Sequence, residues 1–254
     1  MPFNIVYMNL KKFFSKNPNC AIAFSGGVDS SYLLYEAIRY GKKIKAYLIK
    51  TPFQPQFEIE DAIQTAKLLG ADLQIVEYDI LKNKKVCRNH SDRCYDCKKT
   101  LFSTIIKIAE KDGFDIILDG TNASDDASDR PGMKALAELN VYSPLRECGL
   151  SKKQIRRLSK KAGLLTYNKP AYACLATRIT TGTSITKELL SVIEKSETFM
   201  MTLGFSDFRI RTMDQNAKIQ LKKGQFQLFF KNKEAIFNEL SNCFQNVLLD
   251  LNPR

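Results

Sequence analysis

Short apolar segments alternate with longer amphipathic segments over the first 118 residues, and this alternation limits the fold more than any other feature of the chain. The apolar segments have the length and composition of strands and cover residues 19–25, 45–50, 73–78 and 115–118. Helices are predicted at 3–14, between the first two strands up to Tyr40, at 57–69 and at 95–111. Strands that alternate with helices pair in parallel and are covered on both faces. We therefore expect an α/β fold built on a parallel sheet.

The second half of the chain has a looser pattern. A helix is predicted to begin at Pro131, and Ser151 is the expected N-cap of another, followed by a loop over 163–184. Beyond this loop we expect a long helix from 186, strands at 208–212 and 217–221, a helix near 232–241 and a strand near 247–249. We place a boundary near residue 185, between a main domain of residues 1–184 and a small C-terminal α/β domain of residues 185–254.

The charge balance points to acidic partners. The chain has 39 Lys and Arg against 27 Asp and Glu, a net charge of +12, yet no long basic run typical of an RNA-binding module. A membrane helix needs about 20 consecutive apolar residues, and no segment has them. No export signal is recognised at the N-terminus, so we expect a cytoplasmic protein without a membrane partner. The single histidine, His90, excludes a multi-histidine zinc site.

The junction after the first strand has the layout of an anion site. The apolar strand enters the segment Ser-Gly-Gly-Val-Asp-Ser-Ser, which opens a helix, so that backbone N–H groups and the positive helix end converge. The glycines permit close approach of phosphate oxygens, the serine hydroxyls add donors, and the carboxylate is expected to help hold Mg²⁺. The expected nucleotide-binding residues here are Ser25, Gly26, Gly27, Asp29, Ser30 and Ser31.

This segment resembles the PP-loop of ATP pyrophosphatases, whose members cleave ATP between the α- and β-phosphates and transfer AMP to a substrate oxygen. It is not a Walker A loop, because no lysine follows the second glycine, and the chain lacks a dinucleotide-binding GxGxxG motif. Ligands of open α/β sheets bind at the carboxyl ends of the strands. Gly120 and Asn122, which follow the fourth strand, are therefore expected at the nucleotide, and Arg130 is expected to reach its phosphates.

Seven cysteines without an export signal argue against a disulfide framework. Cys94 and Cys97 form a CxxC motif at the start of a predicted helix, which is compatible with a redox pair, half of a zinc site or part of an iron–sulfur site. Cys174 is followed by Arg178, and a nearby arginine favours the thiolate form of a cysteine. We interpret Cys20 and Cys243, which lie in apolar stretches, as buried structural residues.

Motifs along nearly the whole chain, roughly residues 3–250, resemble the sulfur transferases of the LarE type. The matching segments are SGGVDSS, RCYDCKKTLF, GTNASDD followed by RPG, YSPL, KPAYACLATR and FRIR. The resemblance implies an enzyme that uses ATP to adenylylate a carboxylate of a pyridinium biscarboxylic acid mononucleotide and then replaces AMP by sulfur, giving a thiocarboxylate. It also implies a homo-oligomer. Thr177 and the loop 124–129 depart from the family's pattern, which places the acidic metal-binding residues of that loop in question.

The family has two variants that differ in the source of sulfur. In one, the catalytic cysteine, here Cys174, gives up its own sulfur. In the other, this cysteine joins a CxxC pair to hold a 4Fe-4S cluster that carries the transferred sulfur. Because the chain has Cys94 and Cys97 beside Cys174, the resemblance favours the cluster variant, with these three residues as metal ligands.

Arginines are the expected substrate ligands, because guanidinium groups pair bidentately with phosphates and carboxylates. Arg209 and Arg211 lie two apart on a predicted strand and so share a face. Arg178 is expected to join them, and Glu197 to order one of them. Three alternatives remain: a tRNA thiolase of the same superfamily, although nucleic acid is disfavoured as a partner, an amidating ligase, and a non-catalytic nucleotide- or metal-binding protein.

Overall fold

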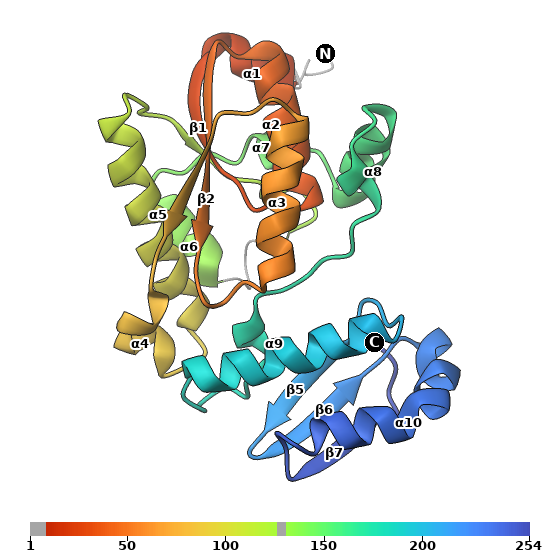
Figure 1. Cartoon of the computed structure of the whole chain (residues 1–254). Coiled ribbons are helices and arrows are strands. Elements are labelled where there is room, and N and C mark those ends of the chain that lie inside the picture. The colour runs from red at the N-terminus through yellow and green to blue at the C-terminus, as the bar shows by residue number, and fades with distance from the viewer. Residues whose placement is uncertain (1–8, 126–130) are drawn as a thin grey trace, which may run out of the picture. The chain divides into compact units, whose positions relative to one another are not determined.

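The computed structural model describes residues 9–125 and 131–254 (Figure 1). The chain divides into two compact units. The first unit comprises the described residues of Met1–Thr51, Gln56–Tyr78 and Cys94–Lys169, and the second comprises Pro52–Pro55, Asp79–Arg93 and Pro170–Arg254. The predicted boundary near residue 185 falls inside the second unit. No helix of the described residues is long and apolar enough to cross a membrane.

A four-stranded parallel sheet forms the centre of the first unit, which confirms the predicted α/β class. Its strands are β1 (Asn19–Ala23), β2 (Lys43–Lys50), β3 (Leu73–Glu77) and β4 (Ile117–Leu118), in the order β3-β2-β1-β4. The parallel register pairs Ile22 with Ala46 on one side and with Leu118 on the other. The central strand β1 therefore delivers its carboxyl end, and the loop that follows, to the middle of one sheet edge.

Helices cover both faces of this sheet, as Figure 1 shows with α2 and α3 on one side of β1 and β2 and α5 on the other. The helices of the first unit are α1 (Leu10–Lys16), α2 (Val28–Tyr40), α3 (Gln56–Leu68), α5 (Arg93–Lys111), α6 (Pro131–Glu138), α7 (Pro144–Glu147) and α8 (Lys152–Lys161), with a 3-10 turn η2 (Leu165–Asn168). Residues 3–8 of the helix predicted at 3–14 lie outside the described residues.

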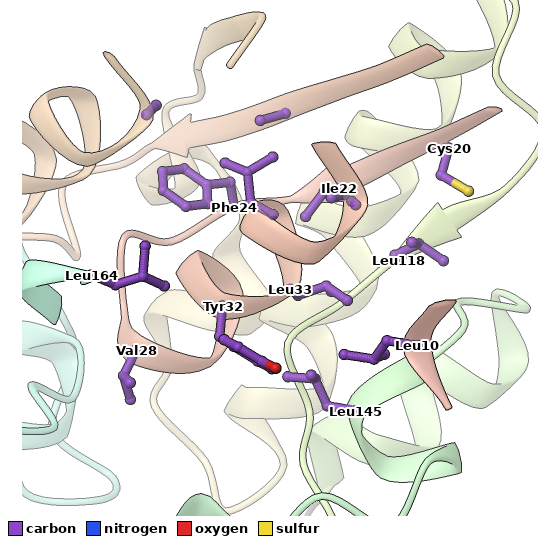
Figure 2. Packing of buried hydrophobic residues seen from close by; sticks show 14 of the residues in the cluster. Leu10, Cys20, Ile22, Phe24, Val28, Tyr32, Leu33, Leu118, Leu145 and Leu164 are labelled. Atoms are coloured by element: carbon purple, nitrogen blue, oxygen red, sulfur yellow. The ribbon is translucent and has the colours of Figure 1, made fainter. Parts of the chain in front are cut away.

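Alternation along β1 divides its side chains between two cores. Cys20 and Ile22 pack with α2, α3 and the buried residues Leu145 and Leu164 (Figure 2), whereas Ala21 packs with Tyr47 against α5. The prediction that Cys20 is buried is confirmed, and the same prediction for Cys243 is wrong, because Cys243 is exposed. The ladders that β1 forms with β2 and β4 fix its register, so the loop after it is held in place.

Local sequence sets the ends of several helices as predicted. Ser151 caps α8: its hydroxyl accepts from the backbone N–H of Gln154, and the Gln154 side chain accepts from the backbone N–H of Ser151. Asn9, which was not predicted as a cap, caps α1 through the N–H of Lys12 and has an extended backbone, so the prediction of a continuous helix over 3–14 is wrong at residue 9. Pro131 begins α6 as expected.

The second unit is built on a three-stranded mixed sheet in the order β5-β6-β7. Its strands are β5 (Arg209–Met213), β6 (Asn216–Gln220) and β7 (Asn246–Asp250), with β5 antiparallel and β7 parallel to β6. The helices are α4 (Lys84–Cys87), α9 (Lys187–Thr202) and α10 (Phe226–Leu240), with the 3-10 turns η1 (Ile80–Lys82), η3 (Leu175–Arg178) and η4 (Lys223–Gln225). Helix α10 begins earlier than the predicted 232, because the turn η4 leads directly into it.

Candidate functional site

The turn between β1 and α2 depends on one glycine for its shape. Gly26 has a φ of +70°, and a Cβ placed there would lie 2.5 Å from the Cβ of Ala62 on α3. Neither the left-handed backbone nor the close approach is open to another residue. At Gly27 a Cβ would meet only the Ser25 hydroxyl at 3.5 Å, an ordinary contact. Gly26 therefore packs the turn against α3, and Gly27 leaves the start of α2 uncovered.

The serines of the turn bond to one another. The hydroxyls of Ser25 and Ser30 lie 3.0 Å apart, and the Ser30 hydroxyl donates to the Gly27 carbonyl at 3.2 Å. Gly27 caps α2 without a side-chain hydrogen bond, so the first N–H groups of this 13-residue helix have no capping side chain. Such groups are donors for an anion. Ser31 is fully buried, and its hydroxyl has no hydrogen-bond partner among the described residues.

A cavity of about 460 Å³ opens at this turn, within the usual size range of small-molecule sites. All of its lining residues belong to the first unit: Ala23, Ser25, Gly27, Asp29, Ser30, Cys94, Lys98, Phe102, Asp119, Gly120, Thr121, Asp125, Pro131, Gly132 and Met133. Of the predicted nucleotide ligands, the lining includes Ser25, Gly27, Asp29, Ser30 and Gly120. Gly26, Ser31 and Asn122 are not among the lining residues, and Arg130 lies outside the described residues.

Asp29 is a carboxylate with an unsatisfied oxygen. Its Oδ2 pairs with the Lys152 ammonium at 2.5 Å, but its Oδ1 is buried and has no hydrogen-bond partner among the described residues. Burial raises the pKa of Asp29, and the nearby Asp125 raises it further, against the opposing effect of Lys152. An orphaned carboxylate oxygen in a cavity that a second carboxylate, Asp125, also lines fits a hard divalent cation such as Mg²⁺.

Asn122 acts at this site through Asp125. Its backbone N–H and its side-chain amide donate to the Oδ2 of Asp125 at 3.0 and 2.8 Å. The amide oxygen of Asn122 in turn accepts from the N–H of Ser124 at 2.8 Å. Asn122 therefore orients a carboxylate that lines the cavity, although its own side chain does not.

The sequence prediction missed Asp119, which directly follows the fourth strand and lines the cavity. Its side chain is almost fully buried and accepts from the hydroxyls of Ser143, at 2.6 Å, and Thr121. Thr121 lines the cavity as well. A polar residue directly after an apolar strand of a parallel sheet is a signal that could have identified Asp119.

Helix α5 contributes a stripe of three side chains to the cavity: Cys94, Lys98 and Phe102, spaced four residues apart. The stem of Lys98 crosses α6 at Gly132, where an added Cβ would lie 2.8 Å from the Lys98 Cδ. The next residue, Lys99, turns away and pairs with Glu138 at 2.8 Å. Lys98 was not among the predicted site residues, because the CxxC motif alone does not show which face of the helix meets the nucleotide cavity.

In the second unit, Cys174 precedes a 3-10 turn whose last residue is Arg178. The guanidinium of Arg178 is fully buried and pairs with Glu197 of α9 at 2.9 and 3.0 Å. It also donates to the carbonyl of Ala173 at 2.7 Å and to the hydroxyl of Thr177 at 2.9 Å. The structure thus brings the predicted residues Cys174, Arg178 and Glu197 together, with Glu197 ordering Arg178.

The other two predicted arginines differ in exposure. Arg209 is buried and donates to the carbonyls of Phe208 and Ala171 at 2.6 and 2.9 Å. Burial, together with the charge of Arg178, lowers the pKa of Arg209 to about 10. Arg211 is exposed and bonds to Gln220 at 2.6 Å and to the Thr177 carbonyl at 2.7 Å. Glu197 pairs with Arg178, and Asp207 lies 4.0 Å from Arg209, so carboxylates offset part of the positive charge of these arginines.

The predicted cluster ligands belong to different units: Cys94 and Cys97 to the first and Cys174 to the second. Cys94 is exposed, the other two are half-buried, and none of the three is in a disulfide. Among the described residues, no three His, Cys, Asp or Glu side chains gather closely enough to hold a metal ion.

Comparison with known proteins identifies the family. No family model matches the chain. It is 34% identical over 251 residues to an uncharacterized protein of Synechocystis, and the aligned region covers 96% of this chain and 92% of that protein. It is 32% identical over 246 residues to an uncharacterized protein of Methanocaldococcus jannaschii, and the aligned region covers 96% of this chain and 93% of that protein.

A third relative carries a function in its name. The chain is 30% identical over 233 residues to the pyridinium-3,5-bisthiocarboxylic acid mononucleotide synthase of Lactiplantibacillus plantarum, with 91% of this chain and 84% of that protein covered. The parallel sheet and the glycine turn after β1 agree with the predicted PP-loop relationship. The chain therefore belongs to the LarE family of PP-loop proteins, the family of that synthase.

Proposed function

We propose that the protein is an ATP-dependent sulfur transferase that converts a carboxylate of a pyridinium biscarboxylic acid mononucleotide to a thiocarboxylate. The carboxylate oxygen attacks the α-phosphate of ATP, which forms an acyl adenylate and releases pyrophosphate. A sulfur nucleophile then attacks the acyl carbon, and AMP leaves. The observation that carries this proposal is the cavity at the PP-loop, which joins anion donors to an orphaned carboxylate oxygen in a member of the LarE family.

Several groups that line the cavity would each bind or neutralise part of the ATP polyphosphate. The N–H groups at the start of α2 and the hydroxyls of Ser25 and Ser30 donate to phosphate oxygens. Lys98 adds a positive charge near the leaving pyrophosphate. Asp29 and Asp125 would hold Mg²⁺, which when bound neutralises polyphosphate charge. We infer that Gly120, Asn122 and Arg130 also belong to the nucleotide site.

Cys174 is the proposed sulfur donor. The buried Arg178 lies against the backbone of its segment, and its charge interacts with that of a Cys174 thiolate. Arg211, the exposed arginine of the set, is the best placed to receive an anionic group of the substrate, whereas Arg209 is buried and lies 4.0 Å from the carboxylate of Asp207. Arg178 and Glu197 contribute through the shape of this region, because they satisfy each other.

The source of sulfur has two versions. In the version that the sequence favours, Cys94, Cys97 and Cys174 are ligands of a 4Fe-4S cluster, which when bound would supply the transferred sulfur. In the alternative, Cys174 loses its own sulfur and becomes dehydroalanine. Iron and sulfide analysis of anaerobically purified protein distinguishes the two versions. The cluster version requires bound iron and sulfide, and it predicts that activity is lost in Cys94→Ala. The alternative predicts that Cys174 loses mass after one turnover.

The activity is tested by mixing the protein with Mg-ATP and the pyridinium biscarboxylic acid mononucleotide, then measuring AMP, pyrophosphate and the mass of the nucleotide. We expect AMP and pyrophosphate in equal amounts and exchange of oxygen for sulfur in the product, both abolished in Asp29→Asn. Lys107→Met, a change on the exposed face of α5, is the matched control and keeps the activity.

Two results would contradict this proposal, and each would favour another function. AMP release that depends on tRNA, with binding that weakens steeply as salt rises, would indicate a tRNA thiolase. Stoichiometric binding of ATP or zinc without any AMP release would indicate a non-catalytic nucleotide- or metal-binding protein. A homo-oligomer in solution is expected in either version of the proposed function.

A further inference from the structure

Tyr172 lies two residues before Cys174 and has no role in the function proposed above. Its ring contacts two cations at once: the Arg178 guanidinium is 4.5 Å and the Arg209 guanidinium 5.1 Å from its centroid. Its hydroxyl donates to Glu197. Arginine groups over an aromatic face are attracted by the ring's electron density, most strongly where water is excluded.

The same two arginines hold the backbone around Cys174. Arg209 donates to the carbonyl of Ala171 at 2.9 Å, and Arg178 donates to the carbonyls of Ala173 and Cys174 at 2.7 and 3.3 Å. Three of the four carbonyls from Ala171 to Cys174 are therefore fixed by guanidinium groups. On the far side of the thiol, the N–H of Leu175 donates to the Phe53 carbonyl at 2.8 Å.

Glu197 supports this arrangement from α9. Its carboxylate is fully buried and accepts from Arg178, from the Tyr172 hydroxyl and from the backbone N–H of Ile210 at 2.9 Å. Both of its oxygens are used by these donors, which is what a buried carboxylate needs in order to remain charged. The carboxylate thus ties the ring and one arginine to β5, whose register is fixed by β6.

We propose that Tyr172 is a positioning residue for Cys174: its ring, which the guanidiniums of Arg178 and Arg209 both contact, keeps both arginines on the carbonyls of residues 171–174. Without the ring, both arginines lose their contact with Tyr172 and hold the carbonyls less firmly. The segment 171–174 then becomes more mobile and the Cys174 thiol more exposed. The consequence for sulfur transfer rests on the proposed role of Cys174, whereas the consequence for the exposure of its thiol does not.

The test measures the rate at which iodoacetamide alkylates Cys174 in the full-length protein after a chelator has removed any iron, by peptide mass spectrometry, with Cys94 and Cys97 followed in the same sample. In Tyr172→Leu we expect Cys174 to react at least about tenfold faster, equivalent to about 1.4 kcal/mol of lost protection. Cys94 and Cys97, which belong to the first unit, keep their rates. Tyr172→Phe retains the ring and stays within about threefold of the original rate at Cys174.

Two further variants complete the experiment. Tyr167→Leu is the matched control, because Tyr167 also carries a cation over its ring, Lys160 at 5.6 Å, but lies in the first unit, and it leaves the Cys174 rate unchanged. The chain has no tryptophan, so Tyr172→Trp introduces a unique fluorophore. Its emission should be blue-shifted and resistant to acrylamide, and the Cys174 rate should stay near that of the original protein.

The proposal is overturned if Cys174 in Tyr172→Leu reacts within about twofold of the original rate, or if all three cysteines accelerate together. It is equally overturned if Tyr172→Phe behaves as Tyr172→Leu does, because the ring would then not be the cause. Should Tyr172→Leu fail to fold by circular dichroism, Arg209→Gln removes one side of the ring contact and must accelerate Cys174 alone. None of these readouts requires ATP or substrate, so failure of the proposed sulfur transfer leaves the result interpretable.

Discussion

Alanine at Gly26 should destabilise the fold, whereas alanine at Gly27 should leave the stability nearly unchanged. In Gly26→Ala the new methyl group would lie 2.5 Å from the Cβ and 2.6 Å from the Cα of Ala62, while the backbone keeps a φ of +70°. In Gly27→Ala the methyl group meets one hydroxyl at 3.5 Å, and the φ of −74° suits any residue. The two changes add the same atom to neighbouring residues, so they serve as matched controls.

The magnitudes follow from these contacts. A left-handed conformation costs alanine roughly 1–2 kcal/mol, and overpacking against a backbone that cannot yield costs about 1–3 kcal/mol. Gly26→Ala should therefore lower the free energy of unfolding by about 2–5 kcal/mol. In Gly27→Ala, alanine is a poorer N-cap than glycine, but it also makes the unfolded chain less flexible, which favours folding. The free energy of unfolding should therefore change by no more than about 1 kcal/mol.

Urea unfolding followed by circular dichroism measures these differences, and equilibrium binding of ATP gives a second readout. We expect Gly27→Ala to fold normally and to bind ATP more weakly, because a methyl group enters the cavity at the start of α2. The reasoning is refuted if Gly26→Ala is as stable as the original protein, or if Gly27→Ala loses as much stability as Gly26→Ala does.

Three other changes test the site. Lys98→Met should raise the KM for ATP on the order of tenfold or more, since a charged hydrogen bond is worth about 1.5–3 kcal/mol, whereas Lys107→Met should leave it unchanged in the same steady-state assay. Burial raises the pKa of Asp29, so the folded state binds the carboxyl proton of Asp29 more tightly than the unfolded state does. The free energy of unfolding should therefore fall as the pH rises from the ordinary aspartate pKa through the raised value. Urea midpoints across this pH range should show a smaller decline in Asp29→Asn, and an equal decline would contradict the assignment. Glu197→Gln leaves the Arg178 charge buried without its partner and should cost about 3–5 kcal/mol of unfolding free energy, measured by urea titration; a change below about 1 kcal/mol would show that the pair is not buried as described.

Local patterns in the sequence were sufficient for most of the secondary structure and for the turn at which the cavity opens. The alternation of apolar and amphipathic segments predicted a parallel sheet, and Ser151 and Pro131 predicted the starts of α8 and α6. The segment after β1 predicted the turn that lines the cavity. Each of these features depends on residues close together in the chain, so their spacing carries the information.

Contacts between distant segments decided the remainder. Lys98 lines the cavity because of the rotation of α5 against the sheet, which places it on the same stripe as Cys94 and which no motif shows. Asp119, directly after β4, was missed although the strand pattern could have identified it. The arginines of the second unit were predicted as one set of substrate ligands, yet packing buries Arg178 and Arg209 and leaves Arg211 exposed.

By itself, the sequence determined that the chain builds a parallel sheet with a glycine turn after its central strand, because strand alternation and a glycine pair are local requirements of the backbone. Only the tertiary structure decided which charged groups face that turn and which satisfy one another in the interior. The reason is that the cost of burying a charge depends on partners far away in the chain, as Glu197 and Arg178 show.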